Sequence, residues 1–117
     1  MKTFKLININ GTESSFEEGF IKEHTKVLAT HFLFQKDIEK YELTAHPAPR
    51  YQFVITLKGK LKFTVTNGDS FIIEPGIILI ANDLKGKGHT WEIIDGDEWQ
   101  RIYIVLPENA EDHFTKD

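Results

Sequence analysis

The sequence contains no cysteine among its 117 residues. This absence excludes disulfide bonds, thiolate metal sites and cysteine nucleophiles. Long apolar runs are also missing, because no segment approaches the roughly 20 residues that span a bilayer. The first residues hold no apolar run followed by a small-residue cleavage site, so we expect no secretory signal. These absences predict a cytoplasmic protein that has no membrane partner.

Positive charge is scarce and dispersed. Lysine and arginine total 14 against 18 aspartates and glutamates, which gives a formal net charge of −4. Proteins that bind nucleic acids normally present a basic face, so we expect no nucleic-acid partner. The sequence also lacks a glycine-rich phosphate loop with Walker spacing and a Gly-x-Ser-x-Gly nucleophile elbow.

Short β-rich runs between turn signals make up most of the chain. Their spacing predicts strands at 27–35, 51–58, 61–66, 77–81, 89–94 and 99–106. Asn67-Gly68 and Pro75-Gly76 predict tight turns, and Gly59 and Gly96 predict two more. We therefore predict an all-β fold, a closed barrel or a jelly roll, because both arrangements limit exposed sheet edges.

The length fits one domain. Within it we expect residues 1–25 to form an N-terminal arm, 26–106 the barrel and 107–117 a C-terminal helix or tail. Pro107 and the acidic residues after it suit the first turn of a helix.

A polar row leads directly into the strand predicted at 51–58. Successive side chains of an extended chain point to opposite faces, which places His46, Ala48, Arg50 and Gln52 on one face. A guanidinium aimed into a barrel would bind a carboxylate or a phosphate. The alternative for Arg50 is an ion pair at the rim, with Glu39, Glu42 or Asp83.

From position 46 to 93 the chain resembles a small single-domain cupin. In the first cupin motif, His46 matches the first histidine and Gly59 the closing glycine. Ala48 and Gln52 stand where the family has a second histidine and a glutamate. The resemblance implies a cupin-type double-stranded β-helix, or jelly-roll barrel, that can hold a small molecule.

The second cupin motif opens at Pro75-Gly76 and closes at His89. The resemblance implies a divalent metal (Zn, Fe, Ni or Mn), which cupins hold with three histidines and a glutamate. In this chain the corresponding ligands would be His46, Gln52 and His89. His31 could add a ligand, or it could be a hydrogen-bonded core residue. The alternative needs no metal, because the two histidines could hydrogen-bond a ligand or each other.

Aromatic and cationic side chains complete the candidate ligand-binding residues. Trp91 shares a strand face with His89, and Arg101 and Tyr103 share a face with Trp99. If these faces point inward, Trp91, Arg101 and Tyr103 line a polar cavity beside Arg50 and Gln52. Alternatively, the aromatic side chains fill the barrel or contact a second subunit.

The leading hypothesis is a cupin that binds a polar, anionic small molecule in the barrel, with His46 and His89 as the catalytic groups if the ligand is turned over. A metal-free isomerase or epimerase resembling the sugar-nucleotide cupins, a metal-dependent dioxygenase and a non-enzymatic ligand sensor are alternatives. Small cupins commonly pair, and the apolar row of Tyr51, Phe53, Ile55 and Leu57 would suit sheet-to-sheet docking. We therefore also predict a homodimer.

Overall fold

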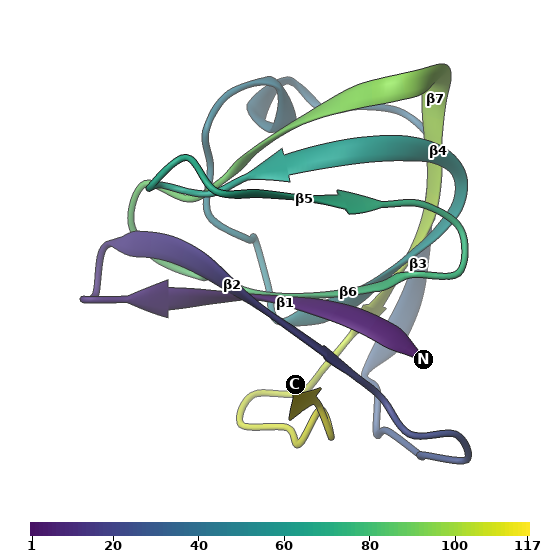
Figure 1. Ribbon diagram of the computed structural model, residues 1–117. Coiled ribbons are helices and arrows are strands. Elements are labelled where there is room, and N and C mark those ends of the chain that lie inside the picture. Colours follow the sequence, from purple (N-terminus) through teal and green to yellow (C-terminus); the bar gives the residue numbers. More distant parts are fainter.

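A computed structural model describes residues 1–117 and is nearly all β (Figure 1). The elements are β1 (Lys2–Ile9), β2 (Glu13–Phe20), β3 (His31–Gln35), the 3-10 turn η1 (Lys40–Leu43), β4 (Gln52–Thr64), β5 (Ser70–Ile73), β6 (Ile78–Asn82), β7 (Thr90–Val105) and β8 (Thr115–Lys116). No helix has the length and apolar character needed to cross a membrane.

All strands belong to one sheet, in the order β3-β7-β4-β6-β1-β2-β8, with β5 paired to β4. The sheet curls over itself, so that β5 lies opposite β1 and β2 (Figure 1). The ring of Phe71 on β5 accordingly lies 4.7 Å from that of Phe4 and 4.6 Å from that of Phe16. The curled sheet encloses the larger of two apolar clusters.

Two of the predicted turns are bends within long strands. Gly59 lies inside β4 and Gly96 inside β7, and these strands pair with each other on both sides of the bend. Gly59 has φ +114°, and a Cβ there would lie 2.7 Å from the carbonyl oxygen of Glu98. The glycine therefore allows close approach of the two strands where they bend, rather than a reversal of the chain.

The ends of the chain differ from expectation. Within the N-terminal arm predicted at 1–25, the chain forms β1 and β2, and β1 lies between β6 and β2 in the sheet. The predicted C-terminal helix is wrong, because 107–117 contains turns and β8 instead. Asn109 and His113 both have φ +60°, which an α-helix does not allow. The Glu111 and Asp112 side chains accept hydrogen bonds from the amides of His113 and Phe114, which favours turns.

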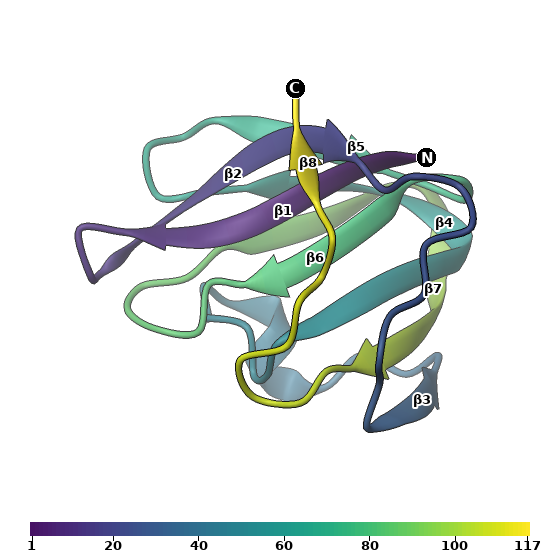
Figure 2. The same cartoon turned by 90° about the horizontal axis from the view of Figure 1, so that it is seen from below.

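The chain itself covers much of the apolar row predicted to form a dimer surface. Phe53 is 7% exposed and belongs to a second cluster with Ile21, Ile80 and Leu106, on which Ala110 and Phe114 also pack. The C-terminal tail runs across this outer side of the sheet (Figure 2). Leu57 remains 51% exposed. The homodimer stays a prediction.

Candidate functional site

The structure brings His46 and His89 side by side. Their backbones form an isolated antiparallel bridge, with His46 N donating to His89 O at 3.1 Å and His89 N donating to His46 O at 2.9 Å. The two imidazole rings lie 4.8 Å apart between centroids. Gly88 permits this approach, because its φ is +77° and a Cβ there would overlap the carbonyl group of His46. The histidine pair is thus set by backbone contact.

The ring of His46 is fixed in one tautomer. Its Nδ1 lies 2.7 Å from the backbone oxygen of Thr44. Since a carbonyl oxygen can only accept a hydrogen bond, Nδ1 carries the hydrogen. Burial lowers the pKa of His46 below its ordinary value of 6.5, against the opposing effect of the Thr44 carbonyl. At neutral pH the ring is therefore uncharged, and Nε2 has a free lone pair.

His89 is oriented by a buried carboxylate that the sequence analysis considered only as a rim partner of Arg50. Oδ2 of Asp83 lies 2.6 Å from Nδ1 of His89 and accepts a hydrogen bond from the Ser14 hydroxyl at 2.7 Å. Asp83 is fully buried, and its Oδ1 has no hydrogen-bond partner. A carboxylate acceptor places the hydrogen of His89 on Nδ1, which leaves Nε2 as the free ring nitrogen.

Both histidines line a small, half-open cavity of about 30 Å³. A site for one water needs roughly 10–15 Å³ by the same measure, so the cavity has room for one or two waters. Most of its lining is apolar. Besides the histidines, the polar and aromatic side chains at its wall are Tyr41, Glu42, Gln52, Phe63, Trp91, Trp99 and Tyr103. Gln52, Trp91 and Tyr103 thus line the same cavity as the two histidines.

Arg50 lies beside this cavity and lacks a carboxylate partner. Its Nε donates to Oε1 of Gln52 at 2.8 Å, and its guanidinium carbon lies 5.3 Å from the centroid of the Tyr103 ring. None of the ion pairs in the chain includes Arg50, so the alternative of a rim ion pair with Glu39, Glu42 or Asp83 is absent. Its half-buried cation remains available to an anion.

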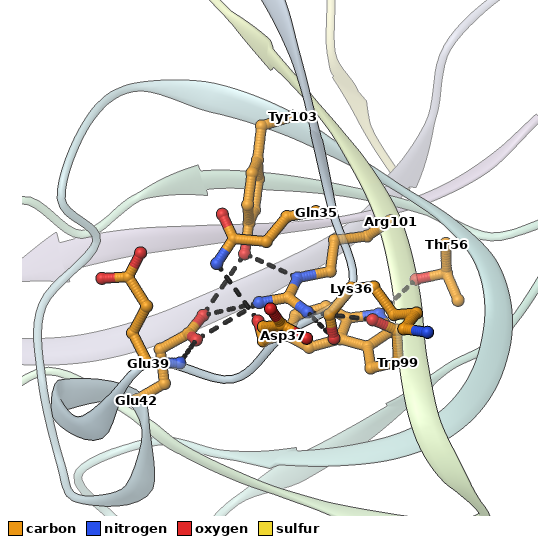
Figure 3. Close-up of polar contacts among 9 residues, drawn as sticks. All are labelled: Gln35, Lys36, Asp37, Glu39, Glu42, Thr56, Trp99, Arg101 and Tyr103. Carbon is orange, nitrogen blue, oxygen red and sulfur yellow. Dashed lines mark hydrogen bonds and ion pairs between the residues drawn. The ribbon is translucent and has the colours of Figure 1, made fainter.

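Arg101 does not line the cavity, although the sequence analysis placed it among the ligand-binding residues. It is 1% exposed, and its Nη2 donates to both carboxylate oxygens of Glu42, at 3.0 and 3.2 Å (Figure 3). Its Nε donates to the hydroxyl of Tyr103 at 2.9 Å. Burial raises the pKa of Tyr103 to about 12, so this phenol keeps its proton.

The residues present do not fit the implied metal site. His46, Gln52 and His89 all line the cavity, but the amide oxygen of Gln52 is already bonded to Arg50. The only carboxylate at the cavity wall, that of Glu42, is bound by Arg101. The chain has no group of three histidine, cysteine, aspartate or glutamate side chains that could hold a metal ion. His31 is exposed on β3 and is neither a ligand nor a core residue.

The site is thus a histidine pair, with one ring fixed by a buried aspartate, inside a compact all-β chain. No protein-family model, curated protein or solved structure matches the chain. Its function therefore has to be inferred from the site itself.

The lowered pKa of His46 predicts a pH dependence of stability. The unfolded chain binds a proton on His46 near pH 6.5, whereas the folded chain binds it only at lower pH. Well above pH 6.5, His46 is unprotonated in both states and does not affect the free energy of unfolding. As the pH falls from about 6.5 to the folded pKa, His46 lowers this free energy. NMR titration of the ring gives the folded pKa, and urea unfolding at several pH values gives the stability. In His46→Gln the decrease attributable to this ring should vanish. A His46 pKa at or above 6.5 would contradict the assignment.

Proposed function

We propose that this chain is a cupin-type barrel that binds a small polar anion and transfers a proton on it without a metal. One observation carries the proposal: both histidines use Nδ1 within the protein, and both line the same cavity. Two imidazoles with free Nε2 atoms suit proton transfer, because a neutral imidazole is a base near physiological pH.

Arg50 supports an anionic ligand. Its guanidinium has no carboxylate partner in the chain, and it lies against Gln52 and Tyr103, which are cavity residues. Guanidinium groups bind carboxylates and phosphates through two parallel hydrogen bonds. A ligand held by Arg50 would place its uncharged part towards the histidines.

The proposed step is a proton transfer at a carbon next to a carbonyl group. Nε2 of His89 takes the proton, the C–H electron pair forms the carbon–carbon double bond of an enolate, and the negative charge moves to the carbonyl oxygen. The imidazolium then returns a proton to carbon, so atoms and charge balance. Asp83 holds the ring in the tautomer that this step needs.

Pyruvate is a suitable probe, because it has a carboxylate for Arg50 and methyl protons next to a carbonyl. In D₂O, we expect the wild-type protein to exchange these protons faster than His89→Ala by about tenfold or more, since general bases contribute at least this much. Proton NMR measures the loss of the methyl signal. His31→Ala is the matched control, because His31 is exposed on β3 and should leave the rate unchanged. Equal rates in the wild type and His89→Ala would refute proton transfer by His89.

A further inference from the structure

A short segment between β3 and β4 closes one side of the cavity. Tyr41 and Glu42, both in η1, belong to the cavity wall, and the edge of the Tyr41 ring packs on His46 with centroids 5.1 Å apart. The other side chains of η1 are exposed, and Glu42 is its only buried residue. The buried side chain that attaches η1 to the barrel is therefore charged, whereas buried side chains are usually apolar.

Contacts that do not involve Glu42 hold the guanidinium of Arg101 in place. Arg101 Nη1 donates to the Trp99 backbone oxygen at 2.9 Å, and Nε donates to the Tyr103 hydroxyl at 2.9 Å. The guanidinium carbon lies 4.4 Å from the centroid of a Trp99 ring. All three residues are on β7, and Figure 3 shows them around the guanidinium. The cation thus stays in place if Glu42 leaves, and Nη2 then has no acceptor.

Arg101 holds the carboxylate of Glu42 as it would hold that of a ligand, and the Glu39 amide of the same turn also donates to its Oε2 at 2.7 Å. Both of its oxygens accept from Nη2 of Arg101, and Oε1 also lies 3.4 Å from the hydroxyl of Tyr103. Removing this carboxylate alone would leave a buried, unpaired guanidinium, which is strongly unfavourable. Exchanging it for another carboxylate keeps the charges paired.

We propose that Arg101 and Tyr103 form a binding site for the carboxylate of a ligand, and that Glu42 occupies this site until the ligand displaces it. Displacement frees η1 from the barrel and enlarges a cavity that otherwise has room for only one or two waters. This inference deepens the proposed function, on which it rests for the existence of a ligand, and it names the ligand class as a small carboxylate. Glu42 is then an internal competitor that limits access to the histidine pair.

Malonate, a small dicarboxylate, tests the proposal by NMR. The chain has two arginines, Arg50 and Arg101, so the protein labelled with ¹⁵N gives two Nε–H signals, which Arg50→Lys assigns. We expect malonate to shift the Arg101 signal and to speed amide exchange of residues 39–44. In Glu42→Gln the competitor keeps its shape but loses its charge, so malonate should bind about tenfold more tightly. Glu98→Gln, which removes an exposed ion pair with Lys58, should bind malonate as the wild type does.

The proposal is overturned if malonate shifts only the Arg50 signal, or if Glu42→Gln binds it no more tightly than the wild type. Glu42 would then be a structural partner of Arg101. If Glu42→Gln fails to fold, the Arg101 signal and amide exchange of the wild type decide the question. These readouts are independent of proton exchange on pyruvate, so malonate can displace Glu42 even if His89 transfers no proton.

Discussion

Replacing Gly88 with alanine should lower the free energy of unfolding by about 4–7 kcal/mol and separate the two histidines. The left-handed conformation at φ +77° costs an alanine about 1–2 kcal/mol. Overlap of the new Cβ with the carbonyl group of His46 adds about 1–3 kcal/mol. Relief of the overlap breaks the two backbone hydrogen bonds between His46 and His89, each worth about 1 kcal/mol. Urea unfolding measures the stability, and the NOE between the two rings reports their separation.

Gly68→Ala is the matched control for this substitution. Gly68 has φ +93°, yet no atom lies within 4 Å of a Cβ built there. An alanine at position 68 therefore has the backbone strain of about 1–2 kcal/mol but no overlap of its Cβ with other atoms. Equal losses of stability in Gly68→Ala and Gly88→Ala would contradict the role assigned to close approach at Gly88. So would an unchanged NOE between His46 and His89.

The meeting of His46 with His89 was implied by the resemblance to the two cupin motifs, whereas local rules account for two features around it. Alternation along an extended chain puts His46 and Gln52 on one face, and a glycine directly before His89 permits close backbone approach. Both features depend on neighbouring residues in the chain. The all-β fold follows in the same way from the spacing of strands and turns, and it is confirmed at that level.

The carboxylate partners of His89 and Arg101 could not be predicted from local patterns, because these contacts depend on how distant segments of the chain meet. Asp83 contacts His89 through the conformation of the loop between β6 and β7, and Ser14 reaches it from β2. Glu42 lies in a 3-10 turn that has no apolar pattern, so nothing local indicates burial. Without Glu42, Arg101 looked like a free cation facing the cavity. A buried arginine on a strand face is itself a signal that an unidentified carboxylate lies opposite.

The expected helix at 107–117 failed for a related reason. Proline and acidic residues favour the start of a helix, but they do not supply an apolar stripe to bury. In the structure Asp112 is instead buried against β1, where Lys5 Nζ lies 2.7 Å from its Oδ2 and Tyr51 donates to the same oxygen. These tertiary contacts outweigh the weak local preference for a helix.

Arg101→Met should be among the most destabilising substitutions in the chain, with a loss of about 3–5 kcal/mol in the free energy of unfolding. Methionine fills part of the space above the Trp99 ring, but the carboxylate of Glu42 is then buried without a partner. Breaking a buried pair from one side is costly for this reason, whereas replacing both members is often tolerated. Glu42→Leu/Arg101→Met should therefore be more stable than Arg101→Met alone. Urea unfolding of the wild type, both single variants and the double variant completes the cycle.

The coupling between the two substitutions separates a buried ion pair from simple loss of packing. We expect a coupling free energy of about 2 kcal/mol or more, because each single variant leaves an uncompensated charge that the double variant removes. Glu98→Gln serves as the reference, since its ion pair with Lys58 is exposed and its loss should leave stability unchanged. If the effects of the single variants simply add, Glu42 and Arg101 are not energetically paired, and η1 must be held to the sheet by other contacts.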